Sequence, residues 1–158
     1  MNLAFALTSL LFVSPSLSLA AADEPVSVVR AAEQTTGTIT ITVTGFSSDY
    51  GQALLYLYND SSGFPTKPAR AWRSFKTPIN GGKATFTLPS LPVREYAAFA
   101  VHDYNANNKL DTNWLGIPKE GVAASNNAKG RMGPPRYRKA KFSLTPAGIR
   151  QVLKLVYI

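Results

Sequence analysis

Residues 36–46 read TGTITITVTGF, and in this stretch the aliphatic residues Ile39, Ile41 and Val43 alternate with threonines. A period of two is typical of a β-strand that buries one of its faces. Residues 50–60, YGQALLYLYND, carry apolar side chains on both faces of a second strand and end in turn residues. Together the two stretches predict a fold built from β-strands.

Further short apolar stretches follow, each bounded by glycine, proline or asparagine. Residues 71–79 and 83–88 flank the turn Asn80-Gly81-Gly82, and this spacing predicts a β-hairpin. Three more strands are expected, at residues 96–101, 139–144 and 149–158. No stretch keeps a helical spacing beyond about ten residues. We therefore expect an all-β protein: an antiparallel β-sandwich, immunoglobulin-like or transthyretin-like, of about seven strands with one long functional loop.

Composition narrows the class of protein. The chain has 158 residues, the length of one domain. Hydrophobic residues make up 45% and charged residues 16%, a balance that excludes a chain kept disordered by its charges. The absence of cysteine excludes disulfides, thiolate nucleophiles and cysteine zinc sites. His102 is the only histidine, which disfavours a histidine metal cage or a Ser-His-Asp triad.

The N-terminal residues have the pattern of an export signal. The apolar run LAFALTSLLFV at residues 3–13 is too short to span a bilayer, and Ala20 and Ala22 have the spacing that signal peptidase prefers. The alternative is a buried N-terminal strand or helix. The expected division is a signal peptide (1–22), a linker or flexible arm (23–36) and the β-sandwich domain (37–158). We expect a bacterial protein that is exported, periplasmic or secreted, and not integral to the membrane.

The positive charge is concentrated near the C-terminus. The formal net charge is +8, while residues 1–120 hold nine basic and nine acidic side chains. Residues 121–158 contain no acid and eight cations: Lys129, Arg131, Arg136, Arg138, Lys139, Lys141, Arg150 and Lys154. Such a field attracts an envelope polysaccharide or another anionic polymer. Nucleic acid is disfavoured because no recognition motif accompanies the cations. The alternative is a cationic surface without a dedicated partner.

The most informative segment is residues 102–133, HDYNANNKLDTNWLGIPKEGVAASNNAKGRMG. A loop of this length is uncommon in a compact domain and is usually functional or disordered. Its apolar side chains favour burial over disorder; they are Leu110, Trp114, Leu115, Ile117 and Val122. We therefore expect a pinned loop that crosses one end or face of the sandwich.

The first half of this loop resembles a calcium-binding loop. Oxygen-bearing side chains stand at relative positions 1, 3, 5 and 9, and a backbone carbonyl follows at position 7; these are Asp103, Asn105, Asn107, Asp111 and Lys109. Asn108 replaces the usual glycine at position 6, although asparagine tolerates the left-handed conformation. Trp114 stands where a bidentate acid is usual, and Glu120 is a candidate to fold back and replace it. The alternative is that these side chains cap turns by bonding their own backbone.

Other residues of the segment are candidates for ligand binding or catalysis. His102 follows a buried strand and is a candidate general base, with Asp103, Asp111 or Glu120 as its partner carboxylate. The alternative is a structural histidine that donates to a loop carbonyl. The polar residues, together with Trp114 and Tyr137, have a composition that suits sugar binding. The candidate ligand-binding residues are His102, Asn113, Trp114, Ser125, Asn126 and Asn127.

This segment also carries a family resemblance. The stretches HDYNANNKLDTN, GIPKEG, SNN and GPP, all within residues 102–135, resemble the hallmark of the family known as domain of unknown function 2141. The resemblance extends from about Gly37 to the C-terminus, and Asn108 stands where the family typically has glycine. It implies a secreted bacterial protein without an established activity, so no catalytic residue is carried over. The passage LPSLPVREYAAFAVHD is also similar to the last strands of transthyretin-like and carboxypeptidase-regulatory-like sandwiches.

Three functions follow from these patterns. The first is an exported, non-catalytic binding or structural module of the cell envelope that uses the 102–133 loop, with calcium as a candidate ordering ion. The second is an envelope-polymer hydrolase that uses His102 with Asp103, Asp111 or Glu120. The third is a cationic binder of anionic polymers that acts through the basic C-terminal quarter.

Overall fold

The alternating stretch forms the central strand of one sheet. In a computed structural model, which describes residues 35–158, strand β1 (Thr36–Thr44) buries Ile39, Ile41 and Val43 and turns its threonines outward. It lies between β4 (Lys83–Pro92), which is antiparallel to it, and β8 (Ile149–Lys154), which is parallel to it. The expected signal peptide and nearly all of the expected linker lie outside the described residues.

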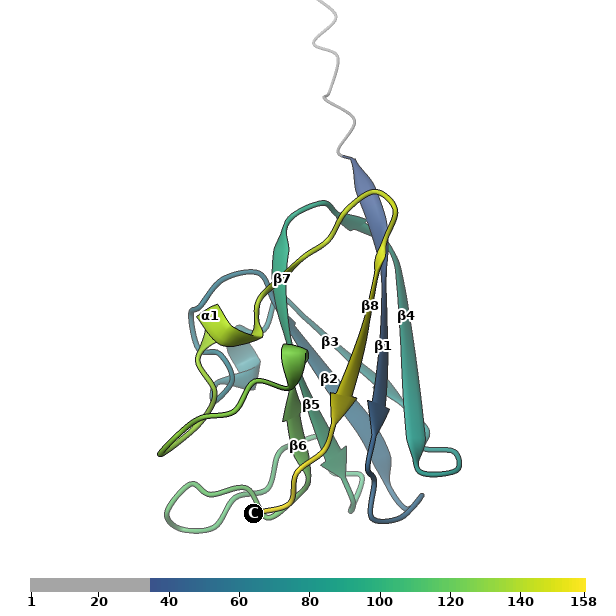
Figure 1. Cartoon of the computed structure of the whole chain (residues 1–158). Coiled ribbons are helices and arrows are strands. Elements are labelled where there is room, and N and C mark those ends of the chain that lie inside the picture. The colour runs from purple at the N-terminus through teal and green to yellow at the C-terminus, as the bar shows by residue number, and fades with distance from the viewer. Residues whose placement is uncertain (1–34) are drawn as a thin grey trace, which may run out of the picture. The chain divides into compact units, whose positions relative to one another are not determined.

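The second sheet has its strands in the order β3-β2-β5-β6 (Figure 1). These strands are β3 (Arg73–Thr77), β2 (Gln52–Tyr58), β5 (Glu95–Asp103) and β6 (Val122–Ala124), and the short β7 (Phe142–Ser143) also pairs with β5. All pairs in this sheet are antiparallel. The helical pieces are η1 (Pro68–Arg70), η2 (Ser125–Asn127) and α1 (Tyr137–Ala140). Within residues 35–158 the structure has eight strands, and the predicted all-β sandwich is confirmed, although the β1–β8 pair is parallel where antiparallel pairing was predicted.

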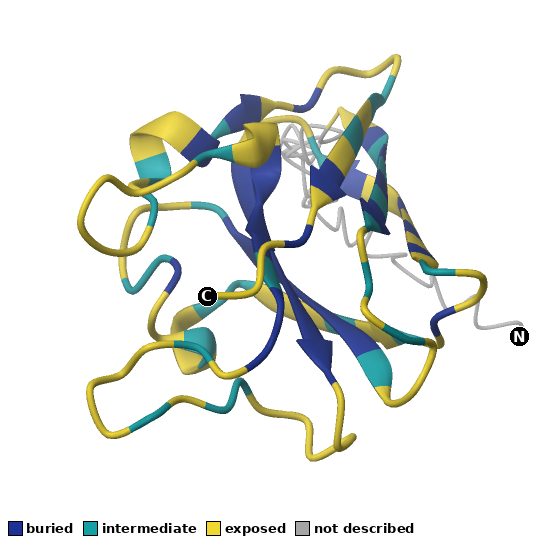
Figure 2. Cartoon of the chain, turned by 60° about the horizontal axis from the view of Figure 1, so that its bottom comes forward, coloured by how far each residue is buried: buried dark blue, intermediate teal, exposed yellow. Residues whose placement is uncertain are grey.

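The second sheet is buried on both faces, which explains the apolar residues on both faces of β2. Leu55 and Leu57 point into the core between the sheets, while Leu54, Tyr56 and Tyr58 point into a second cluster on the outer face. Phe64 and Tyr137 cover this second cluster, and Trp72 packs against the first. The middle of the second sheet is therefore dark along its whole length in Figure 2.

Three details of the sequence-based prediction are wrong. The Asn80–Lys83 turn is tight, but it joins two sheets and not the strands of one hairpin, because β3 pairs with β2 and β4 pairs with β1. The long loop is interrupted by β6 and η2, so its irregular parts are residues 104–121 and 128–136. Trp114, Leu115 and Ile117 were expected to be buried and are exposed, because they stand at the end of a hairpin-like excursion away from both cores.

The C-terminal tail links the two sheets at the end where β5 finishes. After β8, the Leu155 N–H donates to the Thr44 carbonyl, and Val156 exchanges two backbone hydrogen bonds with Val122 of β6. Tyr157 thereby reaches the end of β5. No helix within the described part of the chain is long and apolar enough to cross a membrane.

Candidate functional site

The end of β5 delivers two buried polar residues, His102 and Asp103, to opposite faces of the sheet. The Nε2 atom of His102 lies 2.9 Å from the Tyr50 carbonyl oxygen, and its Nδ1 atom lies 2.8 Å from the Tyr157 hydroxyl. Since a carbonyl only accepts, Nε2 carries a proton and donates it to Tyr50, while Nδ1 and the Tyr157 hydroxyl share the second hydrogen bond. The Ser47 N–H donates to the same hydroxyl at 2.9 Å. Both ring nitrogens therefore hold neighbouring segments in place, as expected of a structural histidine.

Asp103 closes the turn that follows β5. Its Oδ1 accepts the Asn107 N–H at 3.0 Å, and its Oδ2 accepts the Asn108 N–H at 2.8 Å and the Gln52 amide at 2.7 Å. Asn108 has a φ of 63°, so it adopts the left-handed conformation expected at position 6 of a calcium loop. The carboxylate is fully buried, and its hydrogen bonds replace the water that it has lost.

The remaining side chains of the predicted calcium set are hydrogen-bonded to one another, with the two asparagine amides donating to Asp111. Asp111 accepts the Asn105 side-chain amide at 2.8 Å and the Asn107 side-chain amide at 3.1 and 3.2 Å. The Asn107 Oδ1 accepts the Lys109 N–H at 2.9 Å, which is the turn-capping alternative. Within residues 35–158 no group of three or more histidine or acidic side chains is placed to hold a metal. Calcium binding therefore stays a prediction.

Glu120 folds back over the loop, but it bonds backbone instead of joining the Asp and Asn side chains. Its Oε1 accepts the Tyr104 N–H and its Oε2 accepts the Asp111 N–H, both at 3.0 Å. Burial raises the pKa of Glu120, while the two backbone hydrogen bonds oppose part of that rise. The side chain thus ties the beginning of the loop to its middle.

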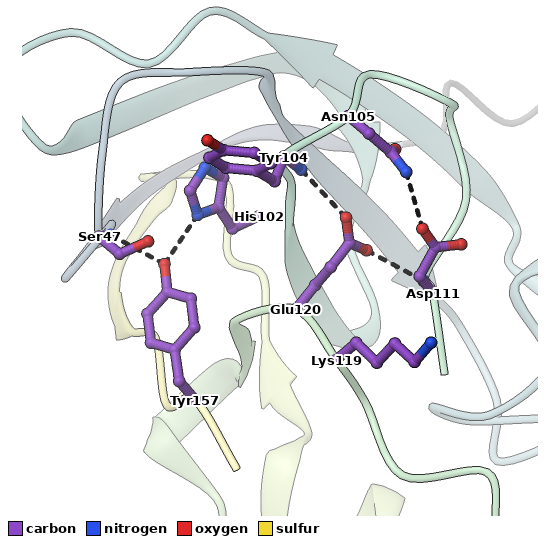
Figure 3. Close-up of a pocket in the computed structure, with 8 residues that line it drawn as sticks. All are labelled: Ser47, His102, Tyr104, Asn105, Asp111, Lys119, Glu120 and Tyr157. Atoms are coloured by element: carbon purple, nitrogen blue, oxygen red, sulfur yellow. Dashed lines mark hydrogen bonds between the residues drawn. The ribbon is translucent and has the colours of Figure 1, made fainter. Parts of the chain in front are cut away.

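These residues surround a pocket of about 300 Å³ at this end of the sandwich (Figure 3). Its lining residues are Ser47, His102, Tyr104, Asn105, Asp111, Lys119, Glu120 and Tyr157. In Figure 3 the His102–Tyr157–Ser47 group lies on one side and the Glu120–Asp111–Asn105 group on the other. The pocket offers polar groups of both signs around an aromatic wall.

The tip of the loop (Thr112–Pro118) is closed by one asparagine. The Asn113 Oδ1 accepts the N–H groups of Leu115 at 2.9 Å and Ile117 at 3.0 Å, and backbone bonds between Asn113 and Ile117 complete the turn. Gly116 supplies the positive φ, 75°, that this turn needs. Trp114 is 90% exposed on this turn.

Ser125, Asn126 and Asn127 lie away from the pocket and hold segments of the fold together. The buried Ser125 hydroxyl accepts the Ala98 N–H at 2.9 Å and donates to the Ala140 carbonyl at 2.6 Å. The Asn126 amide donates to three carbonyls at the end of α1, and Asn127 bonds the edge of β8. The structure thus brings His102, Asp111 and Glu120 to one pocket, leaves Asp103 on the opposite face of the sheet, and separates residues 125–127 from all of them.

Sequence reasoning did not identify two residues of the pocket that come from distant segments, Ser47 and Tyr157. Ser47 follows β1, and Tyr157 follows β8, which is the parallel neighbour of β1. Gly121 is the one local signal, because an added Cβ there would lie 2.5 Å from the Tyr157 ring. Gly121 is the last residue of the GIPKEG stretch, and the close approach of the Tyr157 ring explains why this position has no side chain.

One family matches the chain, the one described as an uncharacterized protein conserved in bacteria, domain of unknown function 2141 (DUF2141), over residues 41–151. The chain belongs to this family. The match covers the strands from β1 into β8 and both irregular loops, so the resemblance found in the sequence is confirmed. No curated protein and no solved structure matches the chain, and the transthyretin-like resemblance stays a prediction.

Proposed function

We propose that this DUF2141 protein is an exported, non-catalytic binding module of the cell envelope that recognises its partner with the loop 104–121. One observation carries the proposal: the loop is fixed in shape by internal hydrogen bonds, yet it presents large apolar side chains to solvent. A preformed recognition loop loses little conformational entropy on binding. Exposed apolar side chains on a rigid support are also typical of interaction sites.

The hydrogen bonds around His102 favour binding over catalysis. A general base needs a free nitrogen within reach of a substrate proton, and both nitrogens of His102 have protein partners. The carboxylates of Asp103 and Glu120 accept backbone N–H groups that keep the loop closed. The hydrolase alternative predicts that His102→Ala abolishes the release of sugars from envelope polymers by a folded protein.

Co-sedimentation with isolated cell-envelope material tests the binding proposal. The purified protein is mixed with the envelope fraction, and the variants Trp114→Ala and Leu115→Ser are compared with Val93→Ser, a change of an exposed apolar residue between β4 and β5 at the opposite end of the sheets. We expect the two loop variants to lose most of the binding and Val93→Ser to keep it. Equal binding by all four proteins would contradict the proposal.

Calcium is a second candidate, and the shape of the turn favours it. Asp103 accepts the N–H groups of positions 5 and 6, position 6 has a positive φ, and the side chains of positions 3, 5 and 9 converge. With two carboxylates in the turn, affinity in the range of extracellular modules, about 10⁻⁴–10⁻³ M, is expected. A bound calcium ion would add to the hydrogen bonds that already hold the loop in the shape that its partner recognises.

Thermal unfolding with calcium or a chelator tests this candidate. At about 100 times the dissociation constant, a ligand of the folded state adds about 2.7 kcal/mol, or several degrees in Tm for a domain of this size. The variant Asp111→Asn should lose the shift, while Asp60→Asn, in a turn outside the loop, should keep it. No shift of the unmodified protein at millimolar calcium contradicts the metal hypothesis.

A further inference from the structure

The loop tip presents a compact group of apolar side chains to solvent. Trp114 is 90%, Leu115 60% and Ile117 39% exposed. The Asn113 side chain and the backbone bonds of the turn hold this group in place, so its exposure is a property of a defined conformation. A tryptophan and two aliphatic side chains gain free energy when a partner removes them from water, and a group of exposed apolar side chains on a defined support is typical of an interaction site.

A second loop has the same character. Residues 128–136 carry Met132, which is 99% exposed, between Lys129 and Arg131 on one side and Arg136 on the other. This loop and the tip of loop 104–121 extend toward the left in both Figure 1 and Figure 2. The two loops, whose sequences carry these apolar residues and cations, therefore lie on the same side of the molecule.

The cations of this region have almost no acidic partners inside the protein. Within residues 35–158 the one ion pair joins Lys141 to Glu95 at 2.8 Å. Seven of the eight cations in residues 121–158 therefore have no salt bridge to an acid in the part of the chain that the structure describes. A segment that carries exposed cations and no acid of its own is complementary to an anionic surface. The partner should accordingly have a negatively charged surface and an apolar interior that the side chains of the tip can enter.

We propose that the two loops dock on the surface of an anionic lipid bilayer. The inference rests on the proposed binding role of loop 104–121 and names its partner. Trp114 and Leu115 enter the boundary between headgroups and acyl chains, where tryptophan is favoured, and the cations of residues 129–139 contact lipid phosphates. Stable peripheral attachment to a membrane requires both an apolar and an electrostatic contribution. The loop tip supplies the first, and the cations supply the second.

A polysaccharide fits the tip less well than a bilayer. Sugar-binding sites place hydrogen-bonding side chains beside the aromatic ring that stacks on the sugar. Next to Trp114 in the sequence, the Asn113 oxygen is already occupied by two N–H groups of the turn, and Leu115 is aliphatic. Leu115 and Ile117 gain nothing from a hydrated sugar surface but gain free energy in hydrocarbon.

Tryptophan fluorescence provides a direct test because the chain has only two tryptophans. Trp72 is half-buried, with its ring 5.5 Å from that of Tyr96 and the Arg73 guanidinium 4.4 Å above it, so its emission should not respond to vesicles. We expect a blue shift when vesicles containing about one-third phosphatidylglycerol are added to the protein. The variant Trp114→Phe should bind the same vesicles without a blue shift.

Variants separate the apolar contribution from the electrostatic one. Leu115→Ser should lower the vesicle partition coefficient about tenfold, because it removes the apolar surface of an inserting side chain without changing the charge. Arg131→Glu should lower it about tenfold on anionic vesicles and have little effect on neutral ones. The matched control is Arg94→Glu, which makes the same change of charge between β4 and β5, at the opposite end of the sheets (Figure 1).

The outcomes distinguish failure of this inference from failure of the proposed function. One outcome is that the protein shows no blue shift and does not sediment with anionic vesicles, but binds purified envelope polysaccharide and loses this binding in Trp114→Ala. That outcome would overturn the bilayer as the partner and leave the proposed binding role standing. Binding to neither material would overturn both. Vesicle binding that Leu115→Ser and Arg131→Glu leave unchanged would also overturn the docking geometry.

Discussion

At the base of loop 104–121 two carboxylates, those of Asp103 and Glu120, are inside the protein, and at its tip the apolar side chains are outside. Asp103 is 0% and Glu120 7% exposed, while Trp114 is 90% exposed. The base therefore contributes to the free energy of folding through hydrogen bonds to buried carboxylates, whereas the tip contributes little beyond its own turn. A region that the fold does not need for stability is available for a partner.

Asp103→Ala should produce the largest loss in the loop. The substitution leaves two backbone N–H groups and the Gln52 amide without their acceptor in a buried position. We expect the free energy of unfolding to fall by about 3 kcal/mol, measured by urea denaturation. Asp60→Ala is the control, because Asp60 caps only the Ser62 N–H in an exposed turn. Equal losses for the two variants would show that the base is not a stabilising element.

Glu120→Gln should cost less and should depend on pH. A glutamine oxygen accepts one of the two N–H groups and its amide faces the other, so we expect a loss of about 1 kcal/mol at neutral pH. Because burial raises the pKa of Glu120 above its ordinary value of 4.5, its protonated form is favoured by folding. That contribution is complete below pH 4.5 and is lost as the pH rises through the folded-state pKa.

Unfolding measured at several pH values checks the sign of this dependence. The stability difference between the unmodified protein and Glu120→Gln should be largest at the acidic end and shrink toward neutral pH. A difference that grows toward neutral pH would mean that the two backbone hydrogen bonds outweigh burial and lower the pKa. The base of the loop would then stabilise the ionised form of Glu120 more than the burial of this side chain indicates.

Asn113→Ala should affect the tip and leave the rest of the protein unchanged. The side chain accepts two N–H groups within the turn and contacts neither core cluster. We expect at most about 1 kcal/mol of lost stability but much faster hydrogen exchange at Leu115 and Ile117. Asn113→Asp keeps the acceptor and should keep the slow exchange. Unchanged exchange in Asn113→Ala would show that the backbone alone fixes the tip.

Strands with a strong local pattern could be predicted from the sequence, whereas strands placed by long-range pairing could not. The alternation in β1 and the two apolar faces of β2 are strong periodic signals, and both strands form where expected. β6 is three residues long, too short for a period, and it owes its place to pairing with β5. The parallel contact between β1 and β8 joins segments about a hundred residues apart, which no local pattern reports.

The candidate site likewise contains residues that local spacing predicts and residues that distant segments bring to it. The spacing of Asp103, Asn105, Asn107 and Asp111 predicts that they converge, and their side chains do lie within hydrogen-bonding distance of one another or of their shared turn. Local spacing cannot show that Tyr157 completes the pocket, because that contact depends on the tail that follows β8. Hydrophobicity alone also misplaces Trp114, since burial depends on whether a turn points toward a core.

Trp114→Ala should be the least destabilising change and the clearest test of the contrast. The side chain belongs to neither core cluster and is almost fully exposed, so we expect the free energy of unfolding to change by less than about 0.5 kcal/mol. Trp72→Ala is the matched control, because that ring packs on the main core and should cost about 3 kcal/mol. A loss above about 1.5 kcal/mol for Trp114→Ala would place the ring against the fold and remove the argument that the tip is free for a partner. A stable variant that no longer sediments with the envelope would assign Trp114 to binding alone.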